Sequence, residues 1–189
     1  LYQETIDLLS AILPGNANYF YARYTMGIAN SRMGKWDEAE NCFRDIIDQP
    51  ASNQSELDLQ DAAKVKLGHI YFSGENANIP EAAGLYGQVK PGSPVYDEAM
   101  LALGWSFLKV NKPDEALKYA QWIIKNMPDS FLLSEAYLVE GYCFYMKKDY
   151  NNAEKSLSNA EKLTEKPVVS MAARDSARKA YEDNEAHFD

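Results

Sequence analysis

The segment from Val95 to Pro128 carries apolar and small residues at helical spacing on both sides of a short break at Asn111-Lys112-Pro113. Residues three or four positions apart fall on one face of a helix, so each side predicts an amphipathic helix. The positions that carry the pattern are Ala99, Leu103, Gly104, Phe107, Ala116, Ala120 and Ile123. We therefore predict a helical hairpin, in which the small residues Gly104 and Ala116 let the two helices approach closely.

The same hairpin pattern recurs on both sides of this segment. Glycines mark the equivalent position of each unit, at Gly27, Gly68, Gly104 and Gly141, with intervals of 41, 36 and 37 residues. The longest interval contains the polar stretch 49–58, which predicts a surface loop because lengthening a loop costs little entropy. We expect one repeat domain over 1–189, divided into the second helix of a truncated repeat (1–16), repeats at 17–54, 55–92, 93–128 and 129–166, and a C-terminal capping helix (167–189). An alternative makes 167–189 the first helix of a further, divergent repeat.

Two places depart from the regular pattern. The second helix of the unit around Gly68 contains Gly84 and Gly87, each of which costs about 1 kcal/mol in a helix interior, so we expect it to be short and mobile. Glu140 stands directly before the glycine of its unit, at a position that is apolar in the other three units. It marks either an exposed edge or a paired carboxylate, and the edge is favoured because burying an unpaired charge is costly.

The pattern resembles the tetratricopeptide repeat (TPR) family, on the Leu-Gly pair 103–104, the aromatic Phe107, the alanines 116 and 120, and the closing Pro128. The stretch GKWDEAE at 34–40 is among the most TPR-like, with Trp36 where the family often has Tyr. The resemblance implies an all-α fold, a right-handed superhelical array of antiparallel helix hairpins. It also implies a non-enzymatic scaffold that binds a protein or peptide.

The linkers between hairpins carry a further resemblance. Pro91-Gly92-Ser93-Pro94 and Pro128-Asp129-Ser130 each end one helix with a proline and offer a serine that caps the next. Such linkers are similar to those of bacterial envelope TPR proteins, namely the Tol-Pal-associated protein and the outer-membrane assembly lipoproteins. This resemblance implies a protein of the bacterial periplasm or associated with the outer membrane, with the cytoplasm as the alternative. Because the chain begins at Leu1 without a Met, we also expect a segment of a longer protein.

Composition narrows the choice of partners. The chain of 189 residues has 28 acidic and 19 basic side chains and a net charge of −9, which argues against nucleic acid as a partner. No stretch approaches the roughly 20 apolar residues that cross a bilayer. Cys42 and Cys143 fall in helical patterns of different repeats, so we predict two buried, unpaired thiols.

The sequence offers little chemistry. His69 and His187 are its two histidines, and neither stands near the partners that a catalytic triad or a metal site requires. Carboxylates such as Asp97 and Glu98 lie in the first turns of helices, where they complement the helix dipole and are expected to stay solvated. We therefore predict no enzyme activity, no cofactor and no metal.

In the TPR family, the first helix of each hairpin lines a concave groove. The residues that face the groove lie three positions before, one position after and four positions after the glycine that marks each unit. The resemblance implies the same positions here. With the basic neighbour Lys109, the candidate groove residues are Tyr24, Ile28, His69, Phe72, Leu101, Trp105, Leu108, Lys109, Tyr142 and Tyr145. This face is apolar and aromatic and lacks the Lys, Asn and Arg set that holds a C-terminal carboxylate. The alternative is that the aromatic stripe belongs to the core, the more common role of such a pattern.

Together these features predict a scaffold that assembles or tethers a bacterial envelope complex, by binding a protein or peptide in the aromatic groove. A second hypothesis is a structural spacer, or a module that self-associates through its terminal repeats into a homo-oligomer. It rests on the truncated first repeat, which leaves an apolar face open.

Overall fold

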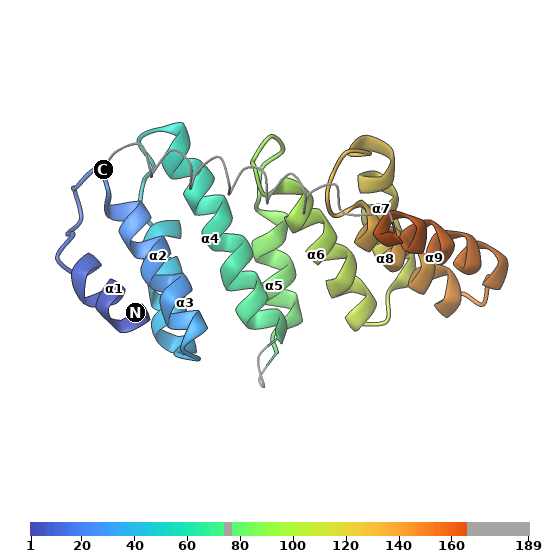
Figure 1. Cartoon of the computed structure of the whole chain (residues 1–189), viewed down its shortest axis with the longest axis horizontal. Helices are drawn as coiled ribbons and strands as arrows, with labels where there is room; N and C mark the ends of the chain where they lie inside the picture. The colour runs from blue at the N-terminus through green and yellow to red at the C-terminus, as the bar shows by residue number, and fades with distance from the viewer. Residues whose placement is uncertain (74–76, 166–189) are drawn as a thin grey trace, which may run out of the picture.

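The computed structural model describes residues 1–73 and 77–165, and the elements assigned in these ranges are all α-helices. They follow one another along the long axis of the molecule (Figure 1). The helices are α1 (Tyr2–Leu9), α2 (Tyr19–Arg32), α3 (Trp36–Ile47), α4 (Gln54–Ser73), α5 (Ile79–Gly87), α6 (Tyr96–Lys109), α7 (Pro113–Asn126), α8 (Leu133–Met146) and α9 (Tyr150–Glu165). None of these helices combines the length and the apolar character that crossing a membrane requires.

Helices α2 to α9 pair as four consecutive hairpins, and α1 packs on α2. Each first helix also contacts the first helix of the next hairpin, from α2 to α4, α4 to α6 and α6 to α8. The predicted all-α solenoid of helix hairpins is confirmed for the part of the chain that the structure describes. The capping helix predicted at 167–189 lies outside it.

Three of the hairpin turns share one backbone geometry. The residue at the turn has a positive φ, 72° at Gly34, 59° at Asn111 and 63° at Lys148. The next N–H then bonds the carbonyl five residues earlier, as in Lys35 to Asn30 at 3.0 Å. This is the Schellman arrangement, which satisfies carbonyls that the end of a helix leaves free. Glycine suits the left-handed conformation, whereas a lysine side chain is strained there.

The glycines that hold equivalent positions in the repeat, here called the column glycines, leave room for side chains of a neighbouring helix. A Cβ on Gly27 would stand 2.6 Å from Cε1 of Phe43 in α3, and one on Gly141 would stand 2.7 Å from Cδ2 of Leu157 in α9. Gly104 differs, because its nearest neighbour would be Cγ1 of Val139, in the following hairpin, at 3.2 Å. The reason lies in the sequence: the small Ala120 occupies the position that corresponds to Phe43 and Leu157.

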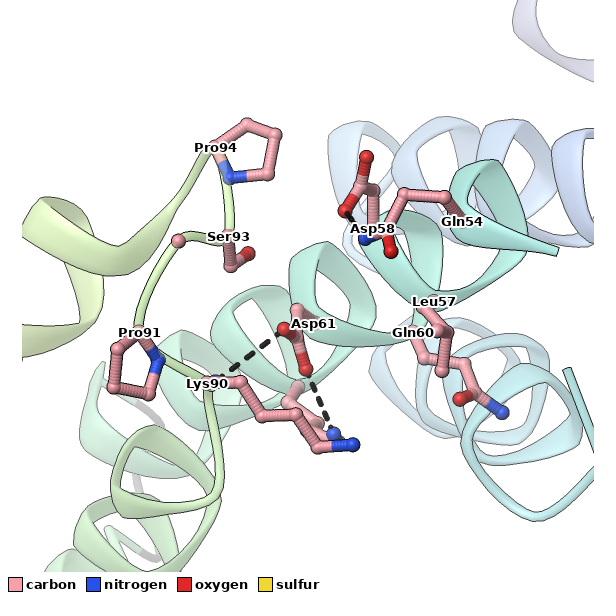
Figure 2. A pocket seen from close by; sticks show the side chains of 11 residues that line it. Gln54, Leu57, Asp58, Gln60, Asp61, Lys90, Pro91, Ser93 and Pro94 are labelled. Carbon is pink, nitrogen blue, oxygen red and sulfur yellow. Dashed lines mark hydrogen bonds and ion pairs between the residues drawn. The ribbon is translucent and has the colours of Figure 1, made fainter.

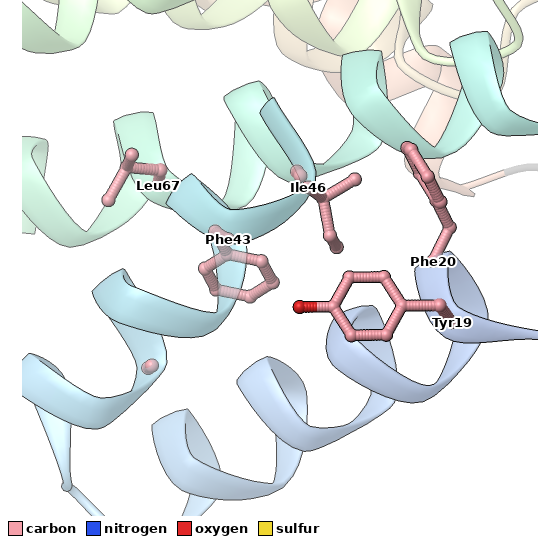
Figure 3. Close-up of a cluster of buried hydrophobic side chains, with 7 residues drawn as sticks. Tyr19, Phe20, Phe43, Ile46 and Leu67 are labelled. Carbon is pink, nitrogen blue, oxygen red and sulfur yellow. The ribbon is translucent and has the colours of Figure 1, made fainter. Parts of the chain in front are cut away.

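The core is divided among the hairpins. The first cluster joins α2, α3 and α4, and Figure 3 shows its large side chains facing one another. Its labelled residues are Tyr19, Phe20, Phe43, Ile46 and Leu67. Two further clusters follow, one centred on Tyr86 of α5 and one on Ile123 of α7. Each cluster takes residues from consecutive hairpins, so every hairpin depends on its neighbours for burial.

Helix α5 is the shortest second helix of the four hairpins, with nine residues, which confirms the predicted short element. The side chain of Asn78 caps it by accepting from the backbone N–H of Glu81. A Cβ on Gly84 or Gly87 would meet no atom within 4 Å, so neither glycine is required by packing. The predicted mobility of this helix stays a prediction.

The exposed edge favoured for Glu140 is wrong. This partly buried carboxylate accepts hydrogen bonds from Oγ of Ser156 at 2.8 Å and from Nε2 of Gln121 at 3.2 Å. These bonds satisfy it between α7, α8 and α9, which removes most of the cost of its burial. The prediction for Cys42 and Cys143 is confirmed, since both thiols are free and buried.

Candidate functional site

The ten candidate groove residues lie on the first helices of the four hairpins, because the repeat places equivalent positions on equivalent helices. Helix α2 carries Tyr24 and Ile28, α4 carries His69 and Phe72, and α8 carries Tyr142 and Tyr145. Helix α6 carries the remaining four, Leu101, Trp105, Leu108 and Lys109.

Several of these residues contribute to packing between hairpins. Leu101 is only 5% exposed and belongs to the core cluster around Ile123. Tyr24 packs against the first cluster, where its ring meets that of Phe43 edge-on at 5.9 Å between centroids. Ile28 and Leu108 are partly buried against the first and third clusters in the same way. For these positions the alternative of a core role describes the contacts better than an open groove.

Three of the ten candidate groove residues are exposed, and they lie on α6 and α8. Tyr142 is 50% exposed and Tyr145 is 62% exposed. Lys109 is also exposed; its Nζ lies 4.4 Å from the centroid of the Phe72 ring and donates to the Phe72 carbonyl at 2.7 Å. This contact links α6 to the end of α4 and covers one face of Phe72.

Trp105 lies between α6 and α8 and is partly buried. Its indole Nε1–H donates to Oε1 of Glu135 at 2.8 Å, and its ring centroid stands 5.9 Å from that of Tyr142, with the planes tilted by 57°. The hydrogen bond and the aromatic contact fix the orientation of the indole from two sides. The indole ring of Trp105 is thus held in one orientation by contacts within the chain.

His69 lies between α4 and α6 in a polar cluster. Its Nδ1 is 2.9 Å from the hydroxyl of Tyr86, and its Nε2 is 3.0 Å from Oε1 of Glu98. Nζ of Lys66 is 2.9 Å from the same carboxylate oxygen. The hydrogen bond from His69, assisted by Lys66, lowers the pKa of Glu98 to about 2, while burial raises the pKa of Tyr86. Glu98 is therefore a partly buried, paired carboxylate, and the expectation that it stays solvated in a first turn is wrong.

A cleft of about 300 Å³ opens beside Trp105. Three of the predicted residues line it, His69, Leu101 and Trp105. The other lining residues were missed in the sequence and are Glu98, Ala102, Phe131, Leu132 and Glu135. Phe131 is 85% exposed although it is a large aromatic residue, and it belongs to the linker before α8. The signal in the sequence that points to Phe131 is the presence of a large aromatic residue directly after the polar linker Pro128-Asp129-Ser130.

A second depression, of about 390 Å³, lies between the N-terminal half of α4 and the loop 90–94 (Figure 2). Its buried carboxylate, Asp61, pairs with Nζ of Lys64 at 2.8 Å and accepts from the backbone N–H of Lys90 at 3.4 Å. These bonds hold the loop against α4, so the polar groups serve the fold. Within the described ranges, no group of three side chains is placed to hold a metal ion.

Comparisons with known proteins find a repeat family in two segments of the chain and solved structures of similar fold. A family model described as a tetratricopeptide repeat matches residues 21–52 and 98–130. No curated protein matches the sequence. Among solved structures, a crystal structure of MamA has a TM-score of 0.70 at 18% identity and covers 87% of this chain and 90% of its own.

Two further MamA structures are similar. MamA of MSR-1 has a TM-score of 0.61 at 19% identity, with 87% of each chain covered. A double mutant of MamA from RS-1 has a TM-score of 0.65 at 17% identity, covering 86% of this chain and 85% of its own. At such identities the likeness concerns the fold alone. Two segments of the chain thus match the tetratricopeptide repeat, and the chain has the helical fold that these MamA structures share.

Proposed function

We propose that the chain is a non-enzymatic scaffold that binds a segment of a partner protein in the cleft beside Trp105. The observation that carries this proposal is the large exposed ring of Phe131, which lines a cleft together with Trp105 and Leu101. Aromatic residues of this kind anchor protein interfaces because they offer a large contact area at a low cost in side-chain entropy. The exposed Tyr142, in contact with Trp105, extends the same surface along α8.

A selection from a random peptide library with the immobilised chain tests this proposal. Peptides recovered with the parent should lose at least about tenfold in affinity for a Phe131→Ala variant, because interface energy is concentrated in a few buried aromatic anchors. Phe131 is almost fully exposed, so its removal leaves the folded core unchanged.

Trp36→Ala is the matched control, since Trp36 is an exposed aromatic residue on α3 outside the cleft. Failure to recover any peptide, or peptides that bind the Phe131→Ala variant as well as the parent, would reject binding at this cleft. Equal loss in both variants would point to general stickiness of aromatic residues.

We further propose that residues 1–189 form one repeat domain and that it assembles or tethers a complex of the bacterial envelope. The support for the envelope is the proline and serine linkers alone, which resemble those of envelope TPR proteins. Fractionation of the source cells with an antibody against the chain distinguishes a periplasmic or outer-membrane location from a cytoplasmic one.

Self-association is a second candidate function, favoured by helix α1. None of its side chains is buried, and Leu8 and Leu13 stand exposed at this end of the array. A second copy that covers these residues would bury apolar surface. Sedimentation over a concentration series tests the idea: a Leu8→Glu variant should shift an oligomer to monomer, and a parent that is monomeric throughout rules it out.

A further inference from the structure

We propose that the partner inserts an arginine side chain into the cleft beside Trp105, where its guanidinium pairs with Glu135. This inference rests on the proposed function and specifies the chemistry of the bound segment. It depends on whether each of the two carboxylates that line the cleft, Glu98 and Glu135, has a cationic partner within the chain.

The two carboxylates are not equivalent. Glu98 already has Lys66 at 2.9 Å and His69 at 3.0 Å, so its charge is compensated within the chain. Glu135 accepts a hydrogen bond from the uncharged indole N–H of Trp105, and no cationic group of the described residues lies within ion-pair distance of it. A partly buried carboxylate without a counter-ion favours a cation brought by a ligand.

The rest of the cleft fits the remainder of an arginine side chain. Its aliphatic walls, Leu101 and Leu132, suit the methylene stem, and the rings of Trp105 and Phe131 suit the guanidinium. Arginine pairs with a carboxylate through two parallel hydrogen bonds and also stacks on aromatic faces, which the compact ammonium of lysine does less well. A volume of about 300 Å³ is at the lower end for ligand pockets and suits one large side chain.

The charge of the whole chain agrees with this choice. A net charge of −9 attracts a basic segment and repels an acidic one, which favours the encounter before any contact forms. We therefore expect the bound segment to be basic around the inserted arginine.

The test uses the ¹⁵N-labelled chain and two small probes, N-acetyl-arginine amide and N-acetyl-norleucine amide. The indole N–H signal of Trp105 is assigned with a Trp105→Phe variant, since the chain has three tryptophans. The arginine probe should shift this signal in a saturable way, and the norleucine probe should shift it much less. In a Glu135→Gln variant the apparent dissociation constant should rise about tenfold, because a neutral amide replaces a charge-assisted partner.

The Glu135→Gln variant keeps an oxygen that accepts from Trp105, so the indole stays in place. Glu154→Gln is the control, an equal change of charge on the exposed face of α9 that should leave probe binding unchanged. Phe131→Ala gives a second, independent variant and should also weaken the arginine probe.

Each outcome decides between the two proposals. Equal shifts with both probes, or unchanged binding in Glu135→Gln, overturn the arginine inference while leaving an apolar binding cleft possible. The arginine inference also fails, and the binding proposal stands, if the library selection recovers peptides without arginine. If no probe shifts Trp105, the arginine inference fails, and recovery of no peptide in the selection rejects the proposed function itself.

Discussion

Replacing a column glycine by alanine should have opposite effects in two hairpins of this chain. Gly27→Ala should destabilise the fold, and Gly104→Ala should leave its stability unchanged or raise it. Both glycines are buried within helices and hold equivalent positions in the repeat. What differs is the residue opposite, which is Phe43 for Gly27 and the small Ala120 for Gly104.

The expected size follows from two opposing contributions. Alanine in place of a glycine inside a helix gains about 1 kcal/mol from backbone entropy. At Gly27 the new Cβ would stand 2.6 Å from Cε1 of Phe43, whose ring is fully buried, and overpacking of this kind costs roughly 1–3 kcal/mol. At Gly104 the nearest atom would be 3.2 Å away, on one methyl group of Val139. The two variants should therefore differ by about 2 kcal/mol in free energy of unfolding.

Urea denaturation followed by far-UV circular dichroism measures this difference. In melting temperature, about 2 kcal/mol corresponds to roughly 4–8 °C for a chain of this size. Hairpins at the end of a repeat array can unfold separately, so the slope of the transition must be compared with the parent before the free energies are subtracted.

A double variant isolates the cause. If the ring of Phe43 produces the cost, Gly27→Ala combined with Phe43→Leu should be more stable than the sum of the single changes predicts. Additive effects, or equal destabilisation by Gly27→Ala and Gly104→Ala, would refute the explanation by the residue opposite. They would show that any side chain in this column separates the helices equally.

Two further predictions concern single positions. Lys148→Gly should stabilise the chain by about 1 kcal/mol, because Lys148 adopts a φ of 63° that glycine adopts without strain; a thermal melt measures this, and a lower melting temperature would contradict it. The pKa of Glu98 is depressed to about 2, so its contribution to stability is fully present above about pH 4.5 and is lost as the pH falls through 2. Glu98→Gln should therefore be less stable than the parent at pH 6, with the gap closing toward pH 2 in parallel urea titrations, and a gap independent of pH would exclude the ion pair as its source.

The hairpins could be predicted because their signals are local. The spacing around Gly104 and Ala116, repeated at Gly27 and Gly141, encodes both the helices and their close contact. Lys148 shows where such signals stop: its left-handed turn is imposed by the Schellman hydrogen bonds, although the residue itself disfavours that conformation.

The cleft depends on contacts between hairpins, which sequence spacing does not encode. From the sequence alone, the first-turn position of Glu98 predicts a solvated carboxylate that complements the helix dipole. Its pairing with His69, 29 residues earlier, depends on how α4 and α6 pack against each other, which the spacing of residues does not encode. Phe131 lies in a linker, whose path no periodicity describes. The first helices that carry Trp105 and His69 were identified correctly, and the residues that complete the cleft around them were not.

The short α5 has a mechanical consequence for the array. A stack of helices resists bending in proportion to the surface over which neighbours press on one another, and α5 offers nine residues where α7 offers 14. We expect the array to be most compliant beside α5. The cleft draws His69 from α4 and Trp105 from α6, one from each side of that compliant joint. A bound segment that contacts both His69 and Trp105 would connect the two sides of this joint, so the array should bend less when the cleft is filled than when it is empty.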